Sequence, residues 1–199
     1  MNDLDDATDE CLLERTRRGD ATAFQKLYDR HRDTTFRFAC LLLGSSEHAE
    51  DVTHDCFLGL IRNPGRFDPR RAALRTYLYA AARNLVLKRL RRPGNESPYG
   101  NPRNQESPDR SKEPLQSLLD REMVDDVRKA LAQLPHPQRE AIVLFEYEEQ
   151  SLADIAAITG APVSTIKWRL HQARESLRRE LAPYLNGGAE KRQEKSNHA

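Results

Sequence analysis

Residues 151–181 read SLADIAAITGAPVSTIKWRLHQARESLRREL. Apolar residues recur at helical spacing on both sides of a short turn, Thr159-Gly160-Ala161-Pro162, and Ser151 is placed to cap the first helix. Gly160 tolerates the left-handed conformation that commonly ends a helix. The pattern therefore predicts two helices that cross closely at a tight turn, a helix-turn-helix.

The second of these helices presents a polar and basic face. Lysine and arginine side chains contact phosphates, and amide, imidazole and indole groups reach base edges in the major groove. The face therefore predicts DNA binding, and an ordinary helical hairpin with a solvated basic surface is the alternative. Its residues are Lys167, Trp168, Arg169, His171, Gln172 and Arg174.

Composition limits the class of protein. The 199 residues are 32% charged and 7% aromatic, which is typical of a helical chain of one or two small domains. No apolar run approaches the roughly 18 residues that span a bilayer. The acidic start of the chain also lacks the order of a signal peptide. We therefore expect a cytoplasmic chain without membrane insertion.

The three cysteines are far apart in the sequence and form no CxxC pair. Such spacing favours a reducing compartment and predicts neither a disulfide framework nor a zinc site. We interpret them as small buried or half-buried apolar residues, namely Cys11, Cys40 and Cys56.

Charge is sorted into blocks, although the net charge of the chain is only +1. Residues 62–92 hold ten basic side chains and one acidic side chain, a net charge of +9, whereas residues 47–55 hold four acidic side chains and no lysine or arginine. The positive block repels itself unless a polyanion is bound. The two blocks together predict two partners of opposite charge.

The segment 92–114 divides the chain and reads RPGNESPYGNPRNQESPDRSKEP. Proline, asparagine, serine and charged residues dominate it, so we expect a flexible linker at 93–114. Helical periodicity fills the flanking units, 8–92 and 115–185, and no strand pattern is found. The predicted fold is all-α, with two small helical domains, the second a helix-turn-helix, and a disordered tail at 186–199.

Motifs for catalysis are absent from the sequence. It contains no Gly-rich phosphate loop, GxSxG or HExxH, and its histidines do not cluster with carboxylates at metal-ligand spacing. We therefore expect no catalytic residues, no metal, no cofactor and no enzymatic activity. A nuclease is the remaining enzyme class, and it would use the carboxylates of Asp51 and Asp55 beside the basic block.

Four motifs follow one another in a specific order. Over residues 9–185 they resemble the bacterial extracytoplasmic-function (ECF) sigma factors, small promoter-selecting subunits of RNA polymerase. The motifs are Glu50-Asp51 with Asp55 and Phe57, Leu78-Tyr79 with Ala82-Arg83-Asn84, Leu134-Pro135 with Gln138-Arg139-Glu140, and Pro162-Val163 with Thr165-Ile166-Lys167 and Arg169-Leu170.

The resemblance implies a function for the whole chain. It implies a sigma factor that binds core polymerase, recognises the −35 and −10 promoter elements and opens the −10 region to start transcription. A stand-alone helix-turn-helix regulator is the alternative, since it would share the C-terminal unit. Many members of the family are held inactive by an anti-sigma protein, so an anti-sigma factor is a further implied partner.

The resemblance implies that the acidic block docks on polymerase. It implies contacts with a coiled coil of the β′ clamp, and the β flap is a second implied polymerase contact. The implied polymerase-binding residues are Glu50, Asp51, His54, Asp55, Phe57, Leu58 and Ile61.

The basic block corresponds to the part that melts the −10 element. Melting needs a pocket for an unstacked base and a positive track for the single strand. Tyr77 either joins that site or simply packs its helix. The implied −10 residues are Phe67, Asp68, Arg70, Arg71, Tyr77, Arg83, Asn84, Lys88, Arg91 and Arg92.

The helix-turn-helix corresponds to the part that binds the −35 element as duplex. Trp168 either stacks on thymine methyl groups or turns inward as core. The implied −35 residues are Ser164, Thr165, Lys167, Trp168, Arg169, His171, Gln172 and Arg174.

Overall fold

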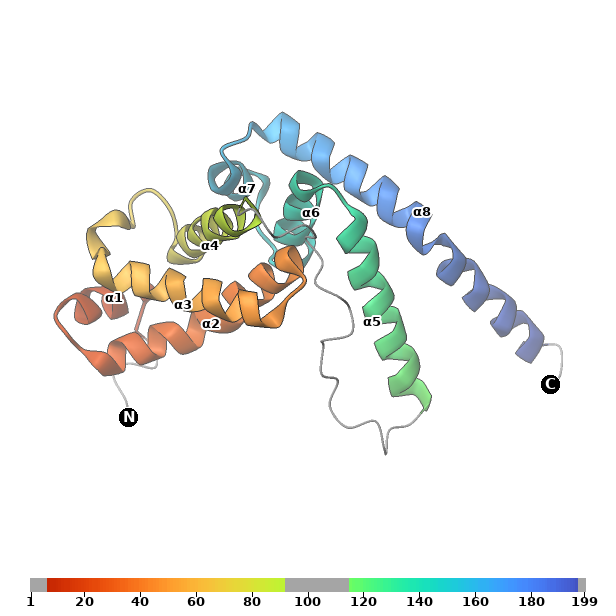
Figure 1. The fold of residues 1–199 in the computed structure, drawn as a ribbon, viewed down its shortest axis with the longest axis horizontal. Coiled ribbons are helices and arrows are strands. Elements are labelled where there is room, and N and C mark those ends of the chain that lie inside the picture. Colours follow the sequence, from red (N-terminus) through yellow and green to blue (C-terminus); the bar gives the residue numbers. More distant parts are fainter. Residues whose placement is uncertain (1–6, 92–114, 197–199) are drawn as a thin grey trace.

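A computed structural model describes residues 7–91 and 115–196, with the backbone alone at 115–122 and 183–196 (Figure 1). The predicted linker at 93–114 and the candidate Arg92 lie outside the described residues. Within those ranges the chain forms helices and turns only, which confirms the predicted all-α class. No helix of these ranges combines the length and apolar character that crossing a bilayer requires.

Three helices of the N-terminal half begin where the sequence supplies a side-chain cap. Thr8, Asp20 and Ser45 each accept a hydrogen bond from a backbone N–H of the helix that follows. Gly44 ends the second helix with a φ of 66°, the left-handed region that glycine adopts at little cost. The elements are α1 Asp9–Arg17, α2 Ala21–Leu43, α3 Ser46–Arg62, the 3-10 turn η1 Pro64–Arg66, and α4 Leu74–Leu90.

The C-terminal half contains the predicted helix-turn-helix. The Ser151 side chain accepts from the N–H of Asp154, and Gly160 closes the first helix at φ 69°. Both features are those expected from the sequence, and the motif is confirmed. The elements are α5 Leu115–Gln133, α6 His136–Ile142, the π-helical turn η3 Val143–Tyr147, α7 Leu152–Thr159 and α8 Val163–Ser196.

The last helix, α8, enters the segment for which the sequence predicted a disordered tail. A disordered tail was expected at 186–199, whereas α8 continues to Ser196. Gly187 and Gly188 lower helix propensity, yet each keeps the N–H that a helix needs, and good helix formers follow them. Two glycines are therefore not enough to end this helix.

The two halves pack into one hydrophobic core. The long helix α2 contacts α1, α3 and α4 in its own half, and α5, α6 and η3 in the other. Figure 1 shows α4 next to α7, the first helix of the helix-turn-helix, and these two helices are in contact. Buried residues from both halves, such as Phe38 and Ile155, belong to a single cluster. The relative placement of the domains, which the sequence left open, is thus compact.

Candidate nucleic-acid interface

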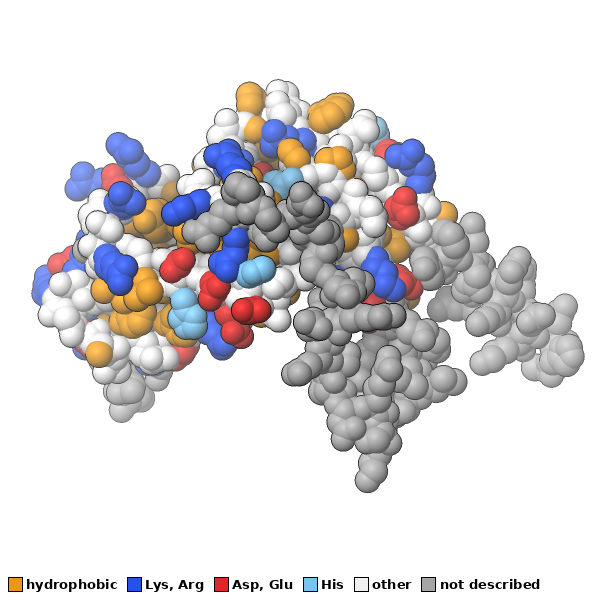
Figure 2. Space-filling view, viewed as in Figure 1, with side chains coloured by type: hydrophobic (Ala, Val, Ile, Leu, Met, Phe, Trp, Pro, Cys, Tyr) orange, Lys and Arg blue, Asp and Glu red, His pale blue; other side chains and the backbone are white. Residues whose placement is uncertain are grey.

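The outer face of α3 carries the acidic block. Figure 2 shows acidic and histidine side chains gathered over α3, with apolar side chains beside them and basic ones over the loop that leads to α4. We call this outer face of α3 the acidic ridge. Leu58 and Ile61 extend it, and each side chain is 42% exposed. The exposed members of the predicted polymerase-binding set are Glu50, Asp51, His54, Asp55, Leu58 and Ile61.

Phe57, also in the predicted polymerase-binding set, points into the core instead. Its side chain is 2% exposed, and its ring meets that of Tyr28 edge-on with centroids 4.8 Å apart. Phe24 lies on another side of it at 6.5 Å, and His54 stacks on Tyr28 from the surface at 6.4 Å. Phe57 therefore supports the ridge from beneath rather than forming part of its surface.

One ion pair links the acidic ridge to the basic block. The Arg89 guanidinium donates to the Asp51 carboxylate at 2.8 Å, and the Asp51 side chain is 56% exposed. Exposed pairs of this kind contribute at most about 1 kcal/mol to stability. The pair shows that the two charge blocks, which are adjacent in the sequence, are also adjacent in space.

The loop before α4 is built around Asp68 and an aromatic pair. The Asp68 carboxylate accepts from the N–H of Arg70 at 3.0 Å and pairs with Arg71 at 3.5 Å, and both arginines are exposed. Phe67 is buried, and its ring meets that of half-buried Tyr77 at 5.4 Å. Burial raises the pKa of the Tyr77 phenol. Of the two roles considered for Tyr77, the packing contact is thus the one that the structure displays.

Helix α4 divides the predicted −10 residues between two faces. Asn84, Lys88 and Arg91 are exposed and share one stripe of the helix. Arg83 lies on another side, where its Nε donates to the Glu140 carboxylate of α6 at 2.5 Å. The stripe of Asn84, Lys88 and Arg91 faces solvent, whereas Arg83 is paired inside the molecule.

The second helix of the motif, α8, is seated by one stripe and exposes another. Ile166 and Leu170 are buried against the neighbouring helices. Trp168 is 57% exposed, so this ring projects outward and does not form core. Among the predicted −35 residues, Ser164, Lys167, Trp168, His171 and Arg174 are exposed, and Thr165, Arg169 and Gln172 are half-buried.

Arg174 is exposed but already has partners. Its guanidinium donates twice to one Glu146 oxygen, at 3.1 and 2.7 Å, and its central carbon lies 5.3 Å from the centroid of the Phe145 ring. Glu146 and Phe145 therefore hold the Arg174 guanidinium in one orientation.

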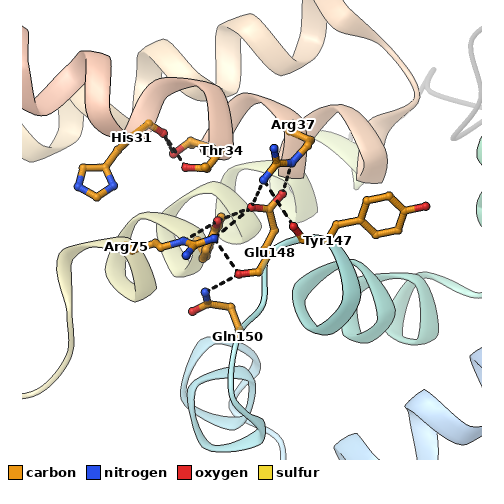
Figure 3. Close-up of polar contacts among 9 residues, drawn as sticks. His31, Thr34, Arg37, Arg75, Tyr147, Glu148 and Gln150 are labelled. Carbon is orange, nitrogen blue, oxygen red and sulfur yellow. Dashed lines mark hydrogen bonds and ion pairs between the residues drawn. The ribbon is translucent and has the colours of Figure 1, made fainter.

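A buried polar cluster that the sequence did not reveal lies between the two halves. The Glu148 side chain is 0% exposed and accepts from Arg37 at 2.7 and 2.8 Å and from the Tyr79 hydroxyl at 2.5 Å (Figure 3). Arg75 donates to the Glu148 backbone carbonyl at 2.8 Å and lies 3.6 Å from its carboxylate. We call Glu148, Arg37, Arg75 and Tyr79 the Glu148 cluster.

The proton states in the Glu148 cluster follow from burial and pairing. Burial, reinforced by the hydrogen bond to Glu148, raises the pKa of Tyr79 to about 12, so the phenol keeps the proton that it donates. The hydrogen bond to Glu148 raises the pKa of the Arg37 guanidinium. A buried carboxylate is tolerated only when charges and donors surround it, as they do here.

Arg139, quoted above only as part of a motif, is a second buried polar anchor. It is 4% exposed, and its guanidinium donates to backbone carbonyls of its own half, including Leu134 at 2.8 Å. One further bond reaches the Leu42 carbonyl of α2 at 3.2 Å. Arg139 and Leu42 are 97 positions apart, and no sequence periodicity relates residues at that distance. The motif therefore indicated that Arg139 matters but could not predict its contact with Leu42.

Comparisons with known families match both halves of the chain. Residues 27–95 match the model described as "Sigma-70 region 2", and residues 125–177 match "Sigma-70, region 4". The acidic ridge and the −10 candidates of α4 fall within the first match, and the helix-turn-helix falls within the second.

Curated relatives resemble the chain over most of its length. The ECF RNA polymerase sigma factor SigM of Mycobacterium tuberculosis is 34% identical over 85% of this chain and 82% of its own. The ECF RNA polymerase sigma factor SigW of Bacillus subtilis is 28% identical over 85% of this chain and 94% of its own.

Solved structures share the arrangement of helices. CnrH, in complex with the cytosolic domain of CnrY, aligns with a TM-score of 0.65 at 23% identity over 88% of this chain and 97% of its own, a likeness of fold alone. The sigma factor RpoE of Bartonella quintana, in complex with the anti-sigma factor NepR, aligns with a TM-score of 0.62 at 25% identity, covering 80% of this chain and 96% of its own.

Proposed function

The chain belongs to the ECF group of the sigma-70 family, and on that premise we propose how its surfaces share the work of transcription initiation. It is an RNA polymerase sigma factor, which selects promoters for core polymerase and is not itself an enzyme. A stand-alone regulator with a helix-turn-helix would have no use for region 2, which this chain contains.

The acidic ridge of α3 is the proposed docking surface for the β′ clamp. Its carboxylates are exposed, and Leu58 and Ile61 supply apolar area next to them. The aromatic packing of Phe57 beneath it holds the ridge in one shape, which lowers the entropic cost of binding. A basic coiled coil is the complementary partner for such a surface.

The exposed stripe of α4 and the loop before it are the proposed −10 surface. Asn84 is placed to bond a base edge, and Lys88 and Arg91 are placed to bind phosphates of the separated strand. Phe67 and Tyr77 support the loop as its floor. Any pocket for an unstacked base is then formed by the loop backbone and its exposed side chains above this floor.

The exposed face of α8 is the proposed −35 surface. Lys167, Trp168 and His171 project from it and are the candidates for base contacts in the major groove. Ser164 and Thr165 at the start of the helix are the candidates for phosphate contacts. The β flap is the proposed polymerase contact of this domain.

Two further assignments follow from the same premise. A subunit of polymerase that binds promoter DNA works in the cytoplasm, and we propose this location. The complex of RpoE with NepR, a relative of similar fold, supports the proposal that an anti-sigma protein also binds this chain.

The observation that carries the proposed roles is the combination of three exposed surfaces in one chain. Region 2 contains the acidic ridge of α3 and the basic face of α4, and region 4 contains the basic face of α8. A docking site for a basic protein and two sites for a polyanion are what a promoter-selecting subunit requires.

Reconstituted transcription tests these roles. Core polymerase stripped of its own sigma factor is mixed with the purified chain and a library of promoter fragments, and the transcripts are sequenced. We expect promoter-specific transcripts only when both proteins are present. Asp51→Arg with Asp55→Arg should abolish core binding, with Asp29→Arg on α2 as the control. Undiminished core binding by the double variant would remove α3 as the docking surface.

A further inference from the structure

The Glu148 cluster joins segments that are distant in the sequence. Glu148 follows η3 in the C-terminal half, and its partners come from α2 and α4 in the N-terminal half, as Figure 3 shows. Arg37 is 111 positions away from Glu148, and Tyr79 is 69 positions away. The carboxylate thus fastens region 4 onto region 2.

Two other contacts hold the same arrangement. Arg83 of α4 pairs with Glu140 of α6, whose side chain is 1% exposed, and Arg139 of α6 bonds the Leu42 carbonyl of α2. Beside them, α4 packs against α7. Each of these contacts is lost if the two regions separate, so together they define a closed conformation.

The closed conformation is incompatible with simultaneous binding at both promoter elements. By the positions that name them, the −35 and −10 elements lie about 25 base pairs apart, which is about 85 Å of straight duplex at 3.4 Å per pair. In the structure α4 contacts α7, and only a short turn separates α7 from the recognition face of α8. Residues 92–114 join the two regions covalently, and a 23-residue segment can reach about 76–83 Å when fully extended, so this connection permits the two regions to separate.

We propose that the Glu148 cluster is a latch that holds the free sigma factor closed, and that Glu148 leaves Arg37, Arg75 and Tyr79 before both promoter elements are bound. This inference rests on the proposed function. Arg37 and Arg75 form the receptor for the carboxylate, and Glu148 is its intramolecular ligand. A partner that binds the open form pulls the equilibrium away from the latch.

The chemistry of the Glu148 cluster suits a latch that can be released. Opening returns the carboxylate and both guanidinium groups to water, and the regained hydration largely offsets the lost ion pairs. Removing one member while the molecule stays closed is different. Without Arg37 the fully buried Glu148 carboxylate loses its bidentate partner, and without Glu148 both Arg37 and Arg75 lose the carboxylate that they share. Neutral substitution of either charge should therefore favour the open form strongly.

Single-molecule energy transfer between the two regions tests the latch. Dyes are attached at Asp33→Cys on α2 and Ala157→Cys on α7, both exposed positions, in a chain carrying Cys11→Ser and Cys40→Ser. The labelled chain should be mainly in the high-transfer state. Glu148→Gln should raise the ratio of open to closed molecules about tenfold or more. Arg37→Gln should do the same, and combining the two should add little, because they remove one interaction.

Glu149→Gln is the matched control. Glu149 is the next residue, carries the same charge and is exposed, so its neutralisation should leave the transfer distribution unchanged. Arg37 lies at the surface of a helix with its side chain 48% exposed, so its variant tests the latch even if Glu148→Gln lowers the stability of region 4. Circular dichroism checks that each variant keeps its helices.

The outcomes separate the latch from the proposed function. Transfer that is low in the unmodified chain, or unchanged by both Glu148→Gln and Arg37→Gln, overturns the latch whatever the chain does with polymerase. A working latch also makes core polymerase bind the open variants more tightly, by the factor by which the open population rises. A chain that opens on substitution but never binds core polymerase would instead overturn the function and leave the latch standing.

Discussion

Basic side chains lie in two different surroundings, on the exposed face of α8 and at the contact between regions 2 and 4. We call this contact the seam. On α8, Lys167 and Trp168 project into solvent. At the seam, Arg83 and Arg139 are held by a carboxylate and by backbone carbonyls. Similar side chains therefore form the proposed DNA surface in one place and hold the two regions together in the other, and burial decides between these roles.

The largest expected effect comes from the seam. Arg139→Met should lower the free energy of unfolding by about 3–5 kcal/mol, because buried carbonyls of both halves lose their donor. Urea denaturation followed by circular dichroism measures the change. Arg128→Met, at an exposed position of α5, should stay within about 0.5 kcal/mol of the unmodified chain. Equal losses in the two variants would contradict the distinction between seam and surface.

The α8 face should show the reverse pattern. Lys167→Ala should cost about 1–3 kcal/mol of discrimination at one position of the −35 element if the lysine bonds a base edge. Its side chain is exposed, so the free energy of unfolding should change by less than about 0.5 kcal/mol. Holoenzyme binding to promoters with single substitutions measures the first quantity. A uniform loss across all sequences would reassign Lys167 to phosphate contact.

A smaller effect is expected from pH at the seam. His136 begins α6, and its Nε2 is buried without a hydrogen-bond partner. Burial, aided by the charges of Arg139, Arg83 and Arg169, lowers the pKa of His136 from 6.5 to about 4. Between pH 6.5 and pH 4 His136 is protonated in the unfolded chain but not in the folded chain. The free energy of unfolding therefore has its full value above pH 6.5 and decreases as the pH falls toward 4.

The measurable part of that loss is on the order of 1 kcal/mol, because solvent partly screens the site. Urea denaturation at pH 7 and pH 5 gives the loss for the unmodified chain and for His136→Gln. The variant should lose less stability on acidification, and the difference isolates this histidine from the other five. An identical pH dependence in both chains would show that His136 keeps an ordinary pKa.

The smallest effect is expected where an ion pair lies at the surface. Asp51→Asn removes the pair with Arg89 and should lower the free energy of unfolding by less than about 1 kcal/mol. The change should shrink further in 0.5 M salt, where screening is strong. A loss as large as that of Arg139→Met would mean that exposure does not separate a surface ion pair from the buried hydrogen bonds of Arg139 in this molecule.

Local features of the fold were predictable from the sequence. Ser151 and Gly160 act within a few residues of their own positions, and the structure confirms the cap and the helix end expected there. Within the predicted tail, α8 continues to Ser196, since two glycines weaken a helix without breaking it. Caps and periodicity are short-range signals, so they fix where most helices begin and end but not how helices meet.

The candidate surfaces were predictable in outline and not residue by residue. The acidic ridge of α3 and the basic face of α8 are exposed as expected. Phe57 and Phe67, which the family pattern placed among the contacts, lie in the core instead. An aromatic residue beside a run of charges looks the same in sequence whether it faces solvent or a neighbouring helix, and only the position of that helix decides.

The sequence by itself determined the helices, the helix-turn-helix, the segregation of charge and the family, because each is written in neighbouring residues or in motifs with fixed spacing. Only the tertiary structure decided that Glu148 is buried between the two regions and that Arg37 and Arg75 are its partners. Those contacts join positions 73 and 111 residues apart. Their existence depends on how two helical units pack, and packing is set by the shape and burial of whole surfaces.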